Sequence, residues 1–248
     1  MGTGDELLRY ERQIMIDGFG IEGQEKLKMA KVVIAGAGGL GGIISIYLVT
    51  AGIGKIRLID YDHVELSNLN RQILYADKDI GKIKVEIARE KLKSLNKDSQ
   101  VEAIKETITE DNVLKLVDGY DLIVDAMDNF STRFILNKVA VQKKIPLFHG
   151  AVRDFEGRAT TIVPGQTPCL NCLYPQISEP GISPVIGVAP AIIGSIQATE
   201  VIKHIVGTGV LLTNRLLIYD GLDMEFMEIQ IKRNPDCKVC YHLWESKI

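Results

Sequence analysis

The chain has 248 residues, of which 46% are hydrophobic and 25% charged, with a formal net charge of −3. These values are typical of a soluble globular enzyme and give no reason to expect nucleic acid or an anionic membrane as a partner. The most apolar stretch, 182–206, contains prolines and charged residues, so we predict a loop and a buried helix there instead of a membrane span. The N-terminus lacks the charged-then-apolar order of a signal peptide, and we expect a cytoplasmic protein.

Helices and strands alternate in the first 150 residues. Apolar side chains at helical spacing predict a helix over 5–17. The elements expected after it are strand 32–35, helix 39–51, strand 56–59, helix 82–95, strand 101–104, helix 111–117, strand 122–125, helix 132–142 and a strand from 146. This order is typical of an α/β, Rossmann-like fold, a mainly parallel sheet with helices on both faces.

The pattern changes in the last hundred residues. Strands are predicted at 160–163 and 215–219, and 225–231 alternates as a one-sided antiparallel strand does. A helix is expected over 192–206. The segment 164–190 holds six of the eight prolines and is predicted to be a long, partly mobile loop. We expect one domain, 1–248, with three parts: a helical segment 1–27, a nucleotide-binding core 28–150, and an antiparallel extension with a crossover loop and zinc knuckle 151–248.

A glycine-rich turn joins the first predicted strand to its helix. It reads Gly36-Ala37-Gly38-Gly39-Leu40-Gly41. In this arrangement backbone N–H groups and a helix N-terminus bind phosphate. Asp60 ends the next strand, where an acidic side chain can hydrogen-bond a ribose. For the glycines alone, a tight turn with close packing and no ligand is the alternative.

Charged side chains near this turn favour a triphosphate over a dinucleotide. The loop after Asp60 contains Asp62, Asn68 and Arg71, and Lys84 lies near the start of the next helix. Arg71 can neutralise phosphate with a forked donor, and Lys84 can add a point charge. Three more lysines lie near Lys84, so a solvated helix face is the alternative for it. A triphosphate site needs several cations and a metal-binding carboxylate, whereas a dinucleotide needs only the ribose acid.

Asp128 and Asn129 follow the predicted strand 122–125. Ligands of open α/β sheets bind outside the carboxyl ends of strands, so Asp128 is well placed to hold magnesium. The alternative for Asp128 is the N-cap of the following helix, a role that Asn129 or Ser131 could take instead.

The four cysteines form two Cys-x-x-Cys pairs, Cys169 with Cys172 and Cys237 with Cys240. Two such pairs are typical of a tetrahedral zinc site, which we expect to be structural because sulfur fills all four positions. Redox pairs or disulfides are alternatives, as is an acyl-accepting role for Cys169 or Cys172.

Together these motifs resemble the ThiF/MoeB/HesA family, relatives of the ubiquitin-activating enzymes, and most closely its molybdopterin-synthase adenylyltransferases. The resemblance covers nearly the whole chain and rests on residues 9–14, the glycine turn, Asp60 with 68–72, Lys84, 125–129, both cysteine pairs and 194–198. It implies an enzyme that uses ATP and magnesium to adenylate the C-terminal glycine of a small ubiquitin-like protein.

The resemblance also implies residue roles: nucleotide contacts for Gly36, Gly38, Gly39, Gly41, Asp62, Asn68 and Asn129, ribose binding for Asp60, phosphate binding for Arg71 and Lys84, and magnesium binding for Asp128. In such enzymes Arg12 reaches the ATP of the other subunit, so we expect a homodimer.

One departure from the family pattern concerns the next step. Many relatives carry a further cysteine in the crossover loop that takes the acyl group or sulfur, and Pro180 stands at that position here. We therefore expect the reaction to stop at the acyl-adenylate, and, since no rhodanese-like segment follows Ile248, we expect an external sulfur donor. The carrier could serve molybdopterin, thiamin or tRNA thiolation. Alternatives are adenylation of a non-protein carboxylate such as a tRNA-linked one, an NAD-dependent oxidoreductase, or a non-catalytic scaffold.

Overall fold

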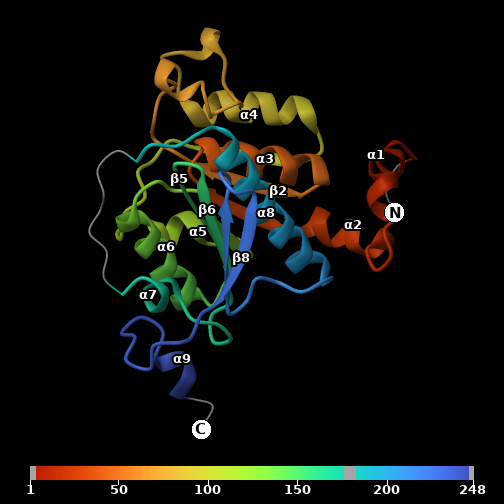
Figure 1. Cartoon of the computed structure of the whole chain (residues 1–248). Coiled ribbons are helices and arrows are strands. Elements are labelled where there is room, and N and C mark those ends of the chain that lie inside the picture. Colours follow the sequence, from red (N-terminus) through yellow and green to blue (C-terminus); the bar gives the residue numbers. More distant parts are fainter. Residues whose placement is uncertain (1–3, 176–182, 246–248) are drawn as a thin grey trace.

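The structure, a computed structural model, describes residues 4–175 and 183–245. These residues form one eight-stranded sheet in the order β3-β2-β1-β4-β5-β6-β7-β8 (Figure 1). The strands are β1 Lys31–Ala35, β2 Lys55–Ile59, β3 Gln100–Ile104, β4 Leu122–Asp125, β5 Leu147–Arg153, β6 Glu156–Ile162, β7 Arg215–Asp220 and β8 Glu225–Gln230.

The first five strands are parallel, as the sequence predicts, and the carboxyl ends of β1 to β4 lie level, whereas β5 continues to Arg153. Ala35 is in register with both Ile59 and Asp125, and Asp125 is in register with His149. All four residues of β4 and the last four of β1 are buried, which is usual for parallel strands covered on both faces. The segments after β1, β2 and β4 therefore begin side by side at one edge of the sheet.

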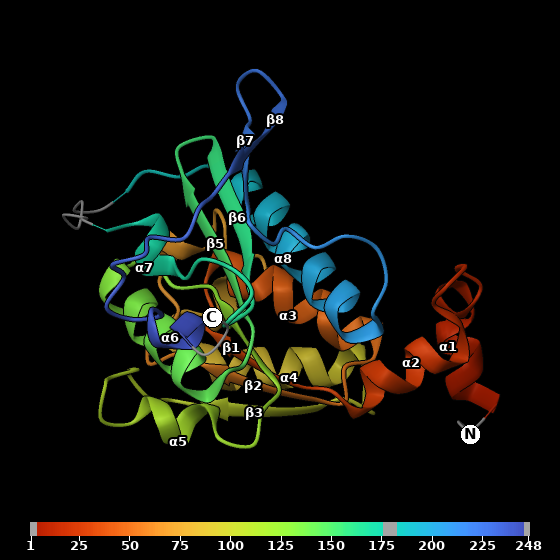
Figure 2. The same cartoon turned by 90° about the horizontal axis from the view of Figure 1, so that it is seen from below.

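Helices cover both faces of the sheet (Figure 2). One core cluster joins the sheet to α2 Gly20–Met29, α3 Gly39–Ala51, α4 Lys84–Leu95 and α8 Val188–Val206. A second core cluster joins the opposite face to α5 Val113–Val117, α6 Phe130–Lys143 and α7 Leu170–Leu173. The remaining described helices are α1 Gly4–Ile14, the short turns η1 Leu66–Asn68 and η2 Asp77–Asp79, and α9 His242–Glu245. In the described part of the chain, none of the helices combines the length and apolar content that crossing a bilayer requires.

The sheet turns antiparallel at the β5–β6 hairpin. Arg153 pairs with Glu156, so Asp154 and Phe155 alone make the turn, and Asp154 adopts a φ of 53°. Aspartate tolerates this left-handed conformation, but the pair lacks the glycine that usually marks a two-residue hairpin. The predicted strand 160–163 was therefore too short at its start.

The proline-rich segment 164–190 is not a single loop. It contains α7, and the backbone N–H of Asp154 donates to Pro184 O, which fixes the segment to the β5–β6 turn. Helix α8 starts four residues before the predicted position 192 and includes Pro190. Proline fits there because first-turn N–H groups have no partner within a helix. Pro180 lies outside the described residues.

The N-terminal segment and the last strand also differ from expectation. The predicted helix 5–17 ends at Ile14, and a second helix, α2, follows it. Strand β8 is antiparallel, as predicted, and pairs with β7, but every residue of β8 is exposed. The one-sided burial expected for this strand is wrong: Met227 and Ile229 are 46% and 51% exposed, because β8 is an edge strand that no described element covers.

Candidate active site

A cavity of about 960 Å³ lies at the carboxyl ends of β1, β2 and β4 and continues along the β5–β6 hairpin. Its volume is within the usual range for small-molecule sites. Nine of the predicted site residues line it: Gly36, Gly38, Gly39, Asp60, Asp62, Arg71, Lys84, Asp128 and Asn129. The register of β1, β2 and β4 brings these residues together from the three segments that follow these strands.

The glycine turn leaves the N-terminus of α3 open. Gly36 has a φ of 101°, and a Cβ at Gly41 would collide with the carbonyl oxygen of Gly36. The Tyr75 hydroxyl donates to Ala37 O at 2.8 Å and anchors the turn. In the described part of the chain no side chain caps α3 at Gly38. The first N–H groups of α3 are therefore available to an anion.

Asp60 ties the glycine turn to the neighbouring loop. Its Oδ2 accepts from Ala37 N at 2.7 Å and its Oδ1 from Asp62 N at 2.8 Å. Burial raises the pKa of Asp60, and these two hydrogen bonds offset part of the rise. Each carboxylate oxygen has a further lone pair, which can accept from a ribose hydroxyl.

Lys84 is a buried cation at the first residue of α4. It is 4% exposed, and its Nζ lies 3.0 Å from Asp62 Oδ2. The alternative of a solvated helix face is therefore wrong for Lys84. Arg71 donates from Nη1 to Ser67 O at 2.9 Å and to Asn70 Oδ1 at 3.0 Å. Two cations thus stand beside the open end of α3.

Asp128 keeps its carboxylate free for the cavity. Asn129 is the N-cap of α6, because its Oδ1 accepts from Thr132 N at 2.9 Å. The N-cap alternative for Asp128 is therefore wrong. In the part of the chain that is described, Asp128 makes one hydrogen bond, accepting from Asn129 Nδ2 at 3.3 Å. Proteins usually bind Mg²⁺ through one or two carboxylates together with phosphate oxygens, and Asp128 fits that need.

Three predicted residues do not line the cavity. Gly41 packs against Gly36, and Asn68 is buried, with its Oδ1 accepting from Glu65 N. Arg12 is exposed on α1, which stands away from the sheet in Figure 1. The neighbouring Gln13 donates to Ala51 O at the end of α3 opposite the glycine turn. Because α3 has 13 residues, it separates these two points by about 20 Å.

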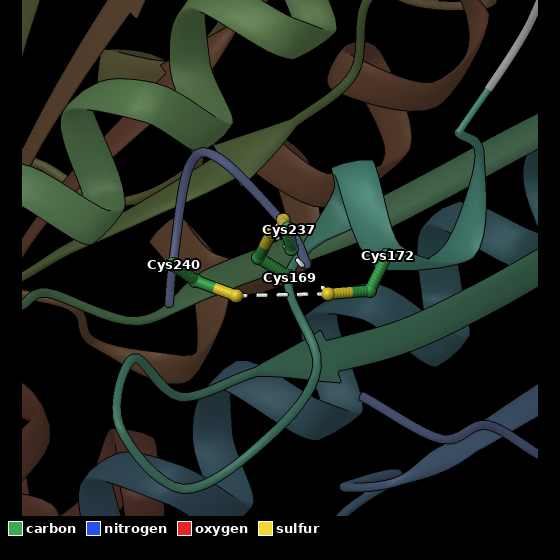
Figure 3. A group of neighbouring side chains, drawn as sticks. All are labelled: Cys169, Cys172, Cys237 and Cys240. Carbon is green, nitrogen blue, oxygen red and sulfur yellow. Dashed lines mark hydrogen bonds between the residues drawn. The ribbon is translucent and has the colours of Figure 1, made fainter. Parts of the chain in front are cut away.

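The four cysteines lie together, as the sequence predicts (Figure 3). The Sγ atoms of Cys169 and Cys237, and those of Cys172 and Cys240, are 3.6 Å apart, and those of Cys169 and Cys172 are 3.9 Å apart. All four thiols are free, so the disulfide alternative is wrong. A tetrahedron with the usual zinc–sulfur bond length has edges of about 3.8 Å, so the cluster fits zinc.

A model of the ThiF family matches residues 10–239. The chain belongs to the ThiF family. Among curated relatives, it is 45% identical to the SAMP-activating enzyme E1 of Haloferax volcanii, covering 95% of this chain and 89% of that protein. It is 43% identical to the sulfur carrier protein adenylyltransferase of Thermus thermophilus, over 96% of this chain and 92% of that protein. It is 40% identical to the adenylyltransferase and sulfurtransferase MOCS3 of Culex quinquefasciatus, of which it spans only 56%.

Solved structures agree with this assignment to the ThiF family. The crystal structure of E. coli MccB with MccA-N7isoASN has a TM-score of 0.86 and 28% identity, and it covers 96% of this chain and 75% of MccB. The crystal structure of E. coli MccB with ATP has a TM-score of 0.82 and 27% identity, and it covers 92% of this chain and 76% of MccB.

Sequence reasoning missed several cavity residues of this ThiF-family chain. They are Gln72, Arg133, Tyr174 and the hairpin residues 151–153 and 156–158. Gln72 adjoins Arg71, and Arg133 follows Asn129 by one helical turn, so adjacency to predicted residues was a usable signal for both. The hairpin residues carried no such signal, because their position depends on an unpredicted turn.

Proposed function

We propose that this ThiF-family enzyme adenylates the C-terminal glycine carboxylate of a small ubiquitin-like sulfur carrier, using ATP and magnesium. The observation that carries the proposal is a single cavity that joins an open phosphate site to the antiparallel half of the sheet. The names of the relatives, which include a SAMP-activating enzyme and a sulfur carrier protein adenylyltransferase, support the substrate class.

The residues of the cavity suit this reaction. A carboxylate is already ionised at neutral pH, so its attack on the α-phosphorus needs orientation and charge relief rather than a general base. The open end of α3 would receive the phosphates, with Arg71 and Lys84 beside them. Asp128 would hold the magnesium ion, which supplies further charge neutralisation when bound.

The carrier's folded body would dock on β7 and β8. Ala151, Arg158, Ile218 and Met227 are successive cross-strand partners from β5 to β8, so they share one face of the sheet. Ala151 and Arg158 line the cavity, and Met227 is exposed on the same face. A carrier on this face could extend its flexible tail along the hairpin into the cavity.

A homodimer would complete the site. Arg12 cannot reach the glycine turn of its own subunit, because α1 attaches at the far end of α3. Helix α1 and the turn after it expose Leu8, Met15 and Ile16, whose exposed fractions are 71%, 68% and 56%. An apolar surface beside an unused cation supports a two-fold dimer that delivers Arg12 to the partner's ATP.

The reaction of this chain would end at the acyl-adenylate. All four cysteines of these 248 residues lie in the metal cluster, so none of them would be free to accept the acyl group. The free thiols also suit a reducing compartment, and we place the enzyme in the cytoplasm.

The test is ATP–pyrophosphate exchange with magnesium and each small protein ending in Gly-Gly from the same genome. We expect exchange with at least one of them and none after removal of its last glycine. Tight ATP binding without exchange for any carrier would shift the substrate to a non-protein carboxylate or the chain to a scaffold role.

A further inference from the structure

Arg133 is a buried cation on the cavity wall that the reaction described above does not use. It lies on α6, one turn after the N-cap Asn129, and is 5% exposed while lining the cavity. Its guanidinium stacks over the Phe130 ring, with Cζ 5.0 Å from the ring centroid. A charged side chain in this position is costly unless its hydrogen-bonding groups are satisfied.

Only some of the hydrogen-bond donors of the Arg133 guanidinium have partners in the protein. Nη2 donates to Met127 O at 2.5 Å and to Gly150 O at 3.3 Å. Nε is buried without a hydrogen-bond partner and lies 3.7 Å from Asp125 Oδ2, beyond hydrogen-bond distance. Among the described residues, Nη1 has no hydrogen-bond partner either. A guanidinium with unused donors at a cavity wall can bind a carboxylate.

The nearest carboxylate of the protein is already engaged elsewhere. Asp125 Oδ2 lies 2.7 Å from His149 Nδ1, and both residues are fully buried. Burial lowers the pKa of His149, so its imidazole is neutral and its Nδ1–H donates to Asp125. Asp125 therefore balances the charge of Arg133 without occupying its hydrogen-bond donors.

Arg133 also stands where the two parts of the cavity meet. Met127 belongs to the turn that carries Asp128, on the nucleotide side. Gly150 precedes Ala151 in β5, where the hairpin side begins. One nitrogen of Arg133 binds the carbonyl oxygens of both residues. An acyl tail that enters along the hairpin would pass this point before it reached the α-phosphate.

We propose that Arg133 recognises the C-terminal carboxylate of the acyl substrate and orients it toward the α-phosphorus of ATP. One carboxylate oxygen accepts a hydrogen bond from the guanidinium, and the other forms the new bond to phosphorus as the bond to pyrophosphate breaks. This inference rests on the proposed function. It assigns to Arg133 the selection of a free carboxylate, whereas Arg71 and Lys84 serve the phosphates.

The experiment compares two ligands and two proteins. A carrier ending in a Gly-Gly carboxylate and the same carrier with a C-terminal amide are titrated into wild-type protein and Arg133→Gln, with a non-hydrolysable ATP analogue and magnesium present. Wild-type protein should bind the carboxylate about 10- to 100-fold more tightly, the range for hydrogen bonds to charged groups. Arg133→Gln should bind both forms equally. A merely structural role would weaken both forms in proportion and preserve the preference.

Two controls keep the outcome decisive. Lys138→Gln removes an exposed cation from the same helix and should keep the preference. If Arg133→Gln does not fold, Arg133→Lys is used in its place. Lysine retains the charge but lacks the forked donors of the guanidinium, so the ratio of carboxylate to amide affinity should fall below one half of the wild-type ratio. An unchanged preference in whichever Arg133 variant folds overturns the inference. Absence of carboxylate-dependent binding in wild-type protein would also overturn the inference, whereas failure of the proposed function would show as absence of ATP–pyrophosphate exchange with the same carrier.

Discussion

The two halves of the sheet differ in how much of a binding site each completes by itself. In the parallel half, Lys84 is paired with Asp62, Asp60 is hydrogen-bonded to the glycine turn, and Asn129 caps α6. In the antiparallel half, β8 is exposed along its whole length and leaves its apolar side chains uncovered. The difference supports our proposal that the nucleotide site is built before ligands arrive and that a partner protein covers the other half. Each prediction below tests one side of this contrast.

Asp128→Ala should have the largest effect, lowering the rate of ATP–pyrophosphate exchange by about 1,000-fold, because it removes the only proposed protein ligand of magnesium. The melting temperature should not change, since Asp128 is exposed and makes one weak hydrogen bond. Asp111→Ala, another exposed carboxylate, is the control. Exchange at the wild-type rate in Asp128→Ala would remove this residue from the mechanism.

Metal removal should be the next largest effect. The cysteine cluster joins α7 to the segment after β8, so a zinc ion bound there would connect two distant parts of the chain. Cys237→Ser should lower the free energy of unfolding by about 3 kcal/mol or more, measured by denaturant titration. Wild-type protein from which a chelator has removed the metal should lose a similar amount of unfolding free energy. An identical unfolding curve with and without metal would show that the cluster does not stabilise the fold.

Lys84→Gln tests the prebuilt nucleotide site and should reduce exchange by about 100-fold, because a charge at the phosphates is lost. Lys82→Gln is a matched control, since Lys82 is two residues away with 52% of its side chain exposed. Both variants should be compared for ATP affinity and for exchange rate. Equal losses of exchange rate in the two variants would show that Lys84 has no specific role at the phosphates.

Met227→Asp tests the partner-dependent half. It places a charge on the cavity face of β8 and should weaken carrier binding about 10-fold without changing ATP affinity. Phe226→Asp changes the adjacent residue, which is 55% exposed against 46% for Met227 and lies on the opposite face, and it should leave carrier binding within about twofold. If Phe226→Asp weakens carrier binding more than Met227→Asp does, the carrier does not dock on the cavity face.

The smallest effect concerns pH. Burial lowers the pKa of His149, so the unfolded chain binds a proton near pH 6.5 that the folded chain does not. Stability should fall as pH decreases from 6.5 to 5.5, by at most about 1.4 kcal/mol for this residue. His149→Gln should flatten the slope of unfolding free energy in that window. The same slope in wild type and variant would assign the pH dependence to other groups.

Site residues could be predicted from the sequence where their position depends on a pattern of a few neighbouring residues. The glycine turn, Asp60 and the cysteine pairs were predictable because each depends on a strand end or a fixed spacing within a few residues. The hairpin residues that line the cavity and the exposure of β8 were not, because they depend on the Asp154-Phe155 turn and on which strand lies at the sheet edge. Those features are set by tertiary packing, to which no short pattern in the chain corresponds.

The most direct test of the central claim is mass spectrometry of the carrier. Wild-type enzyme, ATP, magnesium, pyrophosphatase and a carrier that supports exchange are mixed, and the intact carrier is weighed. We predict a carrier bearing one AMP at its C-terminal glycine, absent in the Asp128→Ala reaction. A carrier of unchanged mass, despite measurable binding of both ATP and carrier, would contradict acyl-adenylate formation by this protein.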